Sequence, residues 1–532
     1  MIGYIIALVV FVSWIVGLYM LHRTKWLDRH GMNMYGPFLM WKTKRGRDLI
    51  ERVASKKRIW SLYGKLSLWI CAGAMFLIML LLLWEATIVP QMAEAPSPEL
   101  ILGIPGLNPV IPLWYGILGL AVAIIVHELA HGIMSRMASV KVNSLGLLFL
   151  VFPMGAFVEP DEEETKRASR SSRAKIFAAG PASNMITAMV VLALFTGMLS
   201  TIEPVHEGAL AVGVVEDSPA NLAGIEPSSV IVSVGGDEIS SADDVSDRDT
   251  SEPGALVSIQ YYYGGELRSA EDVTDGVVVA FVTDGYAGDE YGLEPGMVLI
   301  ALNGTEIGSI DDITEALDST SAGQNVSVSV MTYDEGSGSF VLDPEVTHIV
   351  LSDRYEFYSE YYPDDNEDSN MGKGSIGAGF LVLGLYSYDA DYYSNVLAHP
   401  FAGDSGLTDF SHSWLRLIAL PFLDLAPVRE PITDMYTTGG ALDWMPESVF
   451  WILANSLYWI FWLNLMVGLT NVLPAVPLDG GYIFRDGADY LFSRLSPKST
   501  KEQREKAVGN LILVLSLFVL TLIVWQLVGP RF

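Results

Sequence analysis

The chain has 532 residues, a formal net charge of −30 and a hydrophobic fraction of 51%. This length exceeds one soluble domain, and the apolar content favours several membrane spans over one large core. The single cysteine, Cys71, excludes a disulfide framework and a cysteine-based zinc site, so a metal would need histidine and carboxylate ligands.

Six apolar runs are long enough to cross about 30 Å of hydrocarbon. They predict a multi-pass α-helical membrane protein with about six transmembrane helices. In chain order the runs are Met1–Leu21, Leu66–Trp84, Leu113–Met137, Ile176–Leu199, Val449–Leu473 and Leu511–Val528. The first run lacks the charged start and the cleavage site of a secretory signal, so we expect it to remain as a span.

Lysine and arginine concentrate in three stretches, His22–Lys65, Lys166–Lys175 and Arg485–Lys506. The positive-inside rule makes all three cytoplasmic, which places the chain in the cell membrane with both termini outside. The acidic block Thr201–Glu447 then lies outside, and its first 170 residues hold 36 Asp and Glu but three basic residues. We expect a solvated, salt-adapted surface there rather than a site for a basic partner, and no nucleic-acid partner.

The third run contains His127-Glu128-Leu129-Ala130-His131. On a helix, positions i and i+4 share a face, so both imidazoles can bind one metal ion while Glu128 reaches an attacking water. Ionisable groups inside a span cost about 2.5–3.5 kcal/mol each on insertion scales, so three together need a compensating role. The alternative is a polar contact between helices, or residues that face the cytoplasm.

Two motifs follow the third run. The stretch Asn143–Val158 is apolar but too short and too interrupted to span, so we expect a re-entrant strand pair whose free edge holds an unwound substrate beside the metal. The alternative is a segment that only fills space between spans.

The fourth run then carries Gly180-Pro-Ala-Ser-Asn184, where the small residues suggest close helix packing.

The acidic block contains an internal repeat. Gly224–Ile239 aligns with Gly292–Ile307 at a constant offset of 68 residues, and each copy predicts a strand, a Gly-containing turn and a second strand. The pattern resembles PDZ domains, so we expect an extracytoplasmic β-rich region of two PDZ-like domains that bind peptide C-termini. The alternative is two unrelated β-rich units.

The fifth run ends in Asn471-Val-Leu-Pro-Ala-Val-Pro-Leu-Asp479-Gly-Gly481. Pro474 and Pro477 break the helix, and we expect Gly480 and Gly481 to let the chain turn freely. Zinc bound by two histidines needs a third protein ligand, and Asp479 lies at this break on the side of His127. An ordinary turn after a span would leave the same sequence pattern. The Asn471 amide could hold a developing oxyanion or cap the broken helix.

Taken together, these motifs resemble the site-2 protease family of intramembrane zinc metalloproteases, peptidase family M50. The resemblance implies that His127, His131 and Asp479 bind Zn²⁺ and that Glu128 is the general base. It also implies a substrate-facing Asn471, and substrate-binding roles for Asn184, Gly155 and Phe157. The motif-bearing spans, the third to the fifth, carry most of this resemblance.

The sequence therefore predicts a zinc-dependent endopeptidase that performs regulated proteolysis of transmembrane protein substrates within the lipid bilayer. Two other functions remain open, a metal-ion transporter that uses the same three ligands and a membrane-tethered PDZ adaptor without catalysis. The expected regions are 1–84 (two helices and a basic loop), 85–200 (first part of the catalytic core), 201–350 (tandem PDZ-like domains), 351–447 (a surface segment without a predicted fold) and 448–532 (second part of the core and the last helix).

Overall fold

The structure is a computed structural model. It describes residues 2–43, 47–91, 95–101, 103–150, 152–250, 252–362 and 367–531. The chain forms two compact units, which we describe separately. Unit 1 consists of Met1–Gly197, Ser411–Pro427 and Ile452–Phe532, and unit 2 of Met198–Phe410 and Val428–Trp451.

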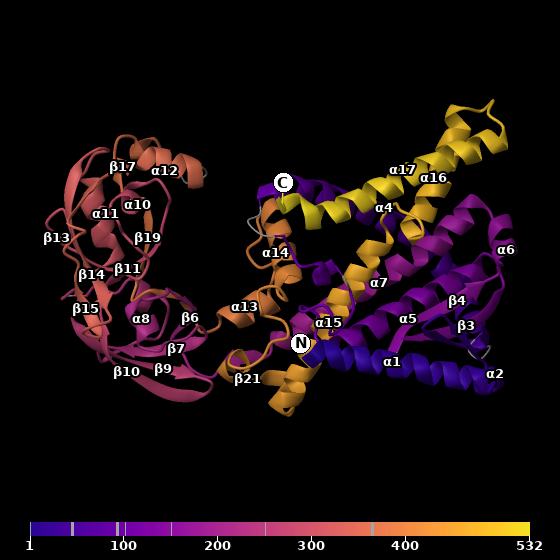
Figure 1. Cartoon of the computed structure of the whole chain (residues 1–532), viewed down its shortest axis with the longest axis horizontal. Coiled ribbons are helices and arrows are strands. Elements are labelled where there is room, and N and C mark those ends of the chain that lie inside the picture. The colour runs from indigo at the N-terminus through magenta and orange to yellow at the C-terminus, as the bar shows by residue number, and fades with distance from the viewer. Residues whose placement is uncertain are drawn as a thin grey trace. The chain divides into compact units, whose positions relative to one another are not determined.

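Within the described residues, five helices are long and apolar enough to cross a membrane (Figure 1). They are α4 (Lys57–Ile88, which a short 3-10 turn extends to Gln91), α5 (Leu113–Met137), α7 (Arg170–Leu199), α15 (Glu447–Asn471) and α17 (Lys501–Val528). Helix α1 (Ile2–Arg23) covers the first apolar run. Within the described residues its apolar stretch is Val9–Arg23, which is shorter than the five helices above. A helical membrane protein is thus confirmed, whereas the number of six spans stays a prediction.

Three of these helices begin well before the apolar run that predicted them. Helix α4 begins at Lys57, α7 at Arg170 and α17 at Lys501. Apolarity defines only the part of a helix that lies in lipid, while backbone hydrogen bonding continues into the polar flank. At α17 a capping box sets the start, because Thr500 Oγ1 accepts from the Gln503 N–H and Gln503 Oε1 accepts from the Thr500 N–H.

Unit 1 also contains an antiparallel sheet of order β1-β2-β3-β4. Its strands are β1 (Met32–Tyr35), β2 (Phe38–Thr43), β3 (Val142–Leu150) and β4 (Phe152–Pro160). The expected strand pair in Asn143–Val158 is present as β3 and β4 and extends further at both ends. Strands β1 and β2 come from the N-terminal basic loop, where only a loop was expected. Gly36 allows the turn between them at φ +58°, and Trp14 of α1 donates to the Pro37 carbonyl at 2.9 Å.

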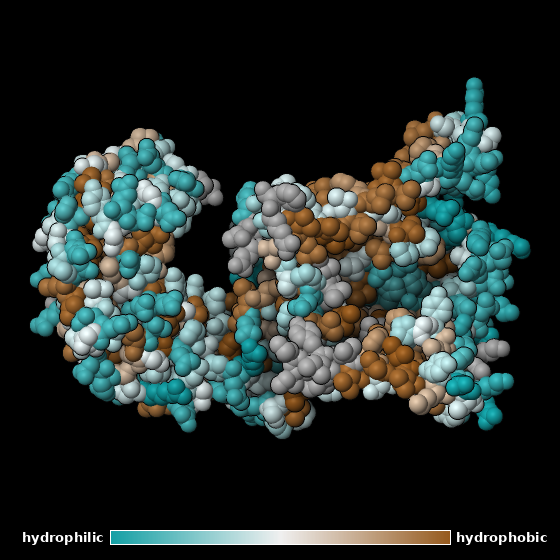
Figure 2. Space-filling model, viewed as in Figure 1, coloured by the Kyte–Doolittle hydropathy of each residue, from teal (hydrophilic) through white to brown (hydrophobic). Residues whose placement is uncertain are grey.

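Four shorter helices complete the part of unit 1 that concerns the site. They are α2 (Trp26–Arg29), α3 (Arg47–Ala54), α6 (Glu162–Arg167) and α16 (Asp479–Leu495). Figure 2 shows brown, apolar atoms over the long helices of unit 1. Large side chains there are strongly exposed, with Trp69 at 79% and Trp114 at 78%. An exposed apolar surface of this extent is expected where helices contact lipid.

Unit 2 contains two antiparallel sheets of matching strand order, β10-β9-β7-β6-β20 and β15-β14-β12-β11-β19. The first is built from β6 (Ala209–Val214), β7 (Ser229–Val234), β8 (Asp237–Glu238), β9 (Leu256–Tyr263), β10 (Glu266–Thr274) and β20 (Leu385–Asp389). The second is built from β11 (Val277–Val282), β12 (Val298–Leu302), β13 (Thr305–Glu306), β14 (Asn325–Asp334), β15 (Ser339–Leu342), β16 (His348–Val350) and β19 (Ala378–Val382). The repeat seen in the sequence is therefore a repeat in the structure, and Gly224 and Gly292 both have φ +80°.

Strands β19 and β20 show that the repeat region extends beyond residue 350, the boundary expected from the sequence. β19 pairs with β11 of the second sheet, and β20 pairs with β6 of the first. One short segment thus completes an edge of each sheet. The sequence repeat ends well before this segment, so the repeat alone did not predict strands β19 and β20.

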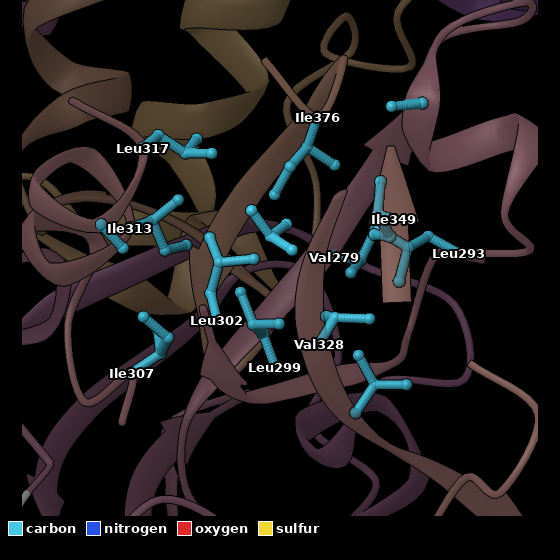
Figure 3. Packing of buried hydrophobic residues seen from close by; sticks show 14 of the residues in the cluster. Val279, Leu293, Leu299, Leu302, Ile307, Ile313, Leu317, Val328, Ile349 and Ile376 are labelled. Carbon is cyan, nitrogen blue, oxygen red and sulfur yellow. The ribbon is translucent and has the colours of Figure 1, made fainter. Parts of the chain in front are cut away.

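Each sheet of unit 2 has its own apolar core. Figure 3 shows the second, in which Val279, Leu299 and Val328 from three strands meet Ile313 and Leu317 of α11 (Ile310–Asp318). The first sheet packs around its own cluster, which includes Ile231, Val234 and Ile259. The remaining named helices and strands of unit 2 are α8 (Pro219–Leu222), α9 (Asp243–Ser246), α10 (Ala287–Glu290), α12 (Arg354–Tyr361), α13 (Tyr392–Ala398), α14 (Leu407–Ala419, which continues into unit 1), β5 (Ile202–Pro204), β17 (Ser352–Asp353), β18 (Gly374–Ser375) and β21 (Tyr436–Thr438).

Candidate metal centre

Helix α5 presents two imidazoles to one point. His127 and His131 lie one turn apart, and their Nε2 atoms are 3.0 Å from each other. His127 is 8% exposed. The expectation that the i, i+4 spacing brings both rings together therefore agrees with the geometry.

Asp479, the first residue of α16, completes the cluster from a segment 348 positions away in the chain. Its Oδ2 lies 3.1 Å from His127 Nε2 and 3.1 Å from His131 Nε2. Among the described residues, these three form the one group of His, Cys, Asp and Glu side chains with ligand atoms close enough to hold a metal ion.

The donor set fits zinc. A tetrahedral zinc ion with bonds of about 2.1 Å holds its ligand atoms about 3.4 Å apart, close to the spacing found here. The Ile176 carbonyl lies 2.7 Å from His131 Nδ1, so that nitrogen carries the proton and Nε2 keeps its lone pair for a metal. His127 Nδ1 is buried without a hydrogen-bond partner among the described residues.

Gly180 of α7 leaves the space in which the ligand atoms converge. A Cβ at this position would lie 2.4 Å from His131 Nε2 and 2.6 Å from His127 Nε2. No side chain larger than hydrogen fits there while the two rings keep their places. The sequence pattern around Gly180 indicates close helix packing, but it does not reveal that the metal ligands are the packing partner.

The interruption between α15 and α16, just before Asp479, brings two backbone segments into close contact. A Cβ on Gly480 would lie 2.1 Å from the Val472 carbonyl oxygen, and one on Gly481 would lie 2.7 Å from the Ala475 backbone. Both glycines are in the first turn of α16, and neither has a positive φ. The expectation that they let the chain turn freely is therefore wrong. They let α16 pack directly onto the segment that leads into it.

Glu128 faces the edge of the unit 1 sheet. Its Oε2 accepts a hydrogen bond of 2.8 Å from the Val158 N–H of β4. Strand β4 is the edge strand of the sheet, and it packs against α5 at Gly132, where a Cβ would meet Val158 at 3.1 Å. The carboxylate next to His127 is thus anchored to backbone at a strand edge.

The other expected site residues lie in different environments. Asn471 donates from Nδ2 to the Val467 carbonyl at 2.9 Å, so in this state its amide nitrogen caps the end of α15. Asn184 is fully buried and packs beside Gly468, and its expected substrate-binding role stays a prediction. Phe157 covers Gly146 on the neighbouring strand, and Gly155 pairs with Leu148.

Comparison with known proteins agrees with this fold and site, which are those of a membrane protein with a metalloprotease-like centre. The model of peptidase family M50 matches residues 115–520, and the chain therefore belongs to that family. Members of this family are intramembrane metalloproteases. The uncharacterized protein MJ0971 of Methanocaldococcus jannaschii is 36% identical over 199 residues, which are 36% of this chain and 51% of that protein. The chain thus spans about half the length of that curated relative.

Proposed function

We propose that the protein is a zinc-dependent endopeptidase that cuts the transmembrane segments of other membrane proteins, as in regulated intramembrane proteolysis. The observation that carries this proposal is the convergence of His127, His131 and Asp479 on one point beside Glu128. Family membership supports the same activity.

In this proposal the three ligands hold zinc, which when bound would polarise the scissile carbonyl and make water easier to deprotonate. Glu128 takes a proton from the attacking water and returns it to the leaving amine. The hydrogen bond from the Val158 N–H orients this carboxylate. Asn471 remains a candidate for stabilising the oxyanion, which would require its amide to leave the Val467 carbonyl.

A transmembrane helix satisfies its own backbone hydrogen bonds, so it must unwind before any bond can be cut. We infer that the free edge of β4 pairs with the unwound segment. The position of β4 at the edge of the sheet, against the helix that carries Glu128, supports this inference.

We further infer that unit 2 is a pair of PDZ-like domains on the extracytoplasmic side of the cell membrane, adapted to high salt. The two matching sheets support the first part. Their edge strands β19 and β20 could each accept a peptide C-terminus by strand addition.

Metal analysis of the purified protein tests the proposal. We expect about one zinc per chain. His127→Ala and Asp479→Ala should lose the zinc, whereas Glu128→Gln should keep it and cleave nothing. Full zinc occupancy in Asp479→Ala would contradict the third ligand. Cleavage by Glu128→Gln at the wild-type rate would contradict Glu128 as the base, whereas a wild type that binds zinc and cleaves nothing would favour a transporter.

A further inference from the structure

An apolar slot of about 230 Å³ lies between α5 and the sheet of unit 1. Its walls include Trp41 of β2, Leu145 and Leu147 of β3, Ala156 of β4 and Leu129 of α5. The mechanism described above uses none of these side chains. The slot nevertheless adjoins the candidate metal centre, because Glu128 lines it as well.

The register of the sheet explains why the slot is apolar. Trp41 is opposite Leu147, which is opposite Ala156, and the next row on the same face is Thr43, Leu145 and Val158. Side chains two residues apart on a strand share a face, so both rows point the same way. Ala156 is the smallest side chain of its row, and it leaves open the space that a larger residue on the edge strand would fill.

Glu128, the proposed general base, is part of the wall of the slot and so places the slot beside the proposed site of cleavage. It is the only ionisable residue among those that line the slot within the described part of the chain. Its carboxylate is bound to the Val158 N–H, and Val158 itself lines the slot. A peptide bond brought to Glu128 for proton transfer therefore brings a neighbouring side chain close to the slot.

The slot is accessible from the surface of unit 1. Two of its lining residues are partly exposed, Trp41 at 42% and Ile125 at 46%. Ile125 lies within α5, which is long and apolar enough to span a membrane, so we expect this surface to face lipid. A side chain can therefore enter from the bilayer without first passing through water.

We propose that the slot holds the side chain of the substrate residue next to the bond that is cut, and that it selects a large apolar side chain. Ala156 sets how much of the slot is free. Charged side chains are excluded, because they would lose their hydration against apolar walls without a partner. This inference rests on the proposed protease function and adds the residue preference at the cleaved bond.

The test uses detergent-solubilised full-length protein and synthetic membrane-spanning peptides. Product masses first identify the bond that the wild type cuts, and the residues on its two sides are then varied through Ala, Leu, Phe and Asp. On one side of the bond we expect kcat/KM to be about 10- to 200-fold higher with Leu or Phe than with Ala, and lowest with Asp. Equal rates for Ala, Leu and Asp on both sides would contradict the slot.

Ala156→Leu should fill the slot. We expect it to lower kcat/KM for the Leu and Phe peptides about tenfold or more relative to kcat/KM for the Ala peptide. Leu147→Ala with Ala156→Leu conserves the volume of this cross-strand pair and should restore the Leu peptide. An equal change for all peptides would overturn the proposal.

Two measurements separate failure of the slot from failure of the proposed function. Zinc content and the thermal midpoint should match the wild type in each variant. In the inactive Glu128→Gln protein, a peptide with a photoreactive phenylalanine analogue beside the bond should crosslink to Leu147 or Ala156. Crosslinking only to Leu148, on the opposite face of the sheet, would overturn the slot even if cleavage is observed. If the wild type binds zinc but cuts no peptide, the protease function itself fails.

Discussion

At the scale of single residues, Gly180 is the position where the site depends on the absence of a side chain. We expect Gly180→Ala to lower zinc affinity at least tenfold, because its Cβ would lie 2.4 Å from His131 Nε2 and force the ring away. Alanine favours a helix over glycine by about 1 kcal/mol, so weaker folding of α7 is not the expected cause.

Gly197→Ala is the matched control for this substitution. Gly197 lies in the same helix, and an added Cβ would meet nothing within 4 Å. Its zinc content should equal that of the wild type. Equal zinc affinity of both alanine variants, measured by competition with a chelator, would contradict the close packing at Gly180.

Asp318 in unit 2 gives a prediction for pH. Its carboxylate bonds with Arg354 at 2.5 Å and with Lys373 at 3.2 Å, and the Arg354 hydrogen bond is the main reason that its pKa lies below the ordinary value. A lowered pKa in the folded state gives stability that is present above about pH 3.9 and is lost as the pH falls through the lowered pKa.

We therefore expect Asp318→Asn to lower the thermal midpoint of the protein at pH 7, with a difference that shrinks in acid as wild-type Asp318 becomes protonated. Scanning fluorimetry at constant salt measures both proteins. Arg354→Gln should also lower the midpoint, and the double variant should lose less than the sum of the two single losses, because the two residues act as a pair. A difference that stays constant from pH 7 to pH 3 would contradict the assignment.

At the scale of secondary-structure elements, α16 must be held in place for Asp479 to reach the histidines. Two ion pairs fix α16 to α7: Arg173 with Asp486, and Arg170 Nε with Asp489 Oδ2 at 2.6 Å. The side chain of Asp486 is 9% exposed. Asp486→Ala would leave the partly buried Arg173 without this carboxylate, so we expect a loss of about 1–3 kcal/mol of stability. We also expect weaker zinc binding, because α16 carries Asp479.

The exposed pair of Lys501 with Glu505 provides a control for the α16 prediction. Its side chains are 84% and 59% exposed, so Glu505→Ala should change stability by about 0.5 kcal/mol or less. Reversing the buried pair with Arg173→Asp and Asp486→Arg should restore part of the zinc affinity that Asp486→Ala loses. Equal thermal midpoints for Asp486→Ala and Glu505→Ala would show that the pair does not hold α16.

The proposed pairing of substrate with β4 predicts a pattern in proline substitutions from Gly146 to Phe157. The Val158 N–H points to Glu128, so by alternation the Ala156 N–H points to the same outer edge and the Phe157 N–H points inward to β3. Ala156→Pro should stop cleavage while zinc content and folding stay normal, whereas Phe157→Pro should disturb the sheet itself. If every inactive proline variant also loses zinc, the edge does not hold substrate.

At the scale of the whole molecule, the sequence predicted local features well, but it did not predict contacts between distant segments. The spacing of His127 and His131, the broken helix before Asp479 and the repeat in the acidic block are each readable within a short window. Strands β1 and β2 join β3 across about 100 residues, and β20 joins β6 across about 170. Nothing local specifies such partners. A strand-like alternation around Gly36 and Pro37 was present in the sequence, but it does not say which sheet it joins.

We propose that the two sheets of unit 2 act as a size filter that admits only substrates with a short external part, and deletion of Gly213–Thr347 is the simplest test. The structure shows that this deletion leaves β19 and β20 without their partners. A cleaner deletion replaces His206–Asp389, which removes both sheets whole. Strand β5 remains paired with β21, and the Tyr436 hydroxyl donates to the Ala390 carbonyl at 2.8 Å, so the new ends lie near each other. Four Gly and Ser residues, which reach about 13 Å, can join them.

A membrane-spanning reporter with a folded external domain, and the same reporter trimmed to a short external tail, distinguish two roles for this region. If it filters substrates by size, the intact protein cuts only the trimmed reporter and the deletion variant cuts both. A deletion variant that keeps its zinc but cuts neither reporter would show that the region recruits substrates. Cleavage of the untrimmed reporter by the intact protein would also contradict the filter, because a folded external domain would then not prevent cleavage.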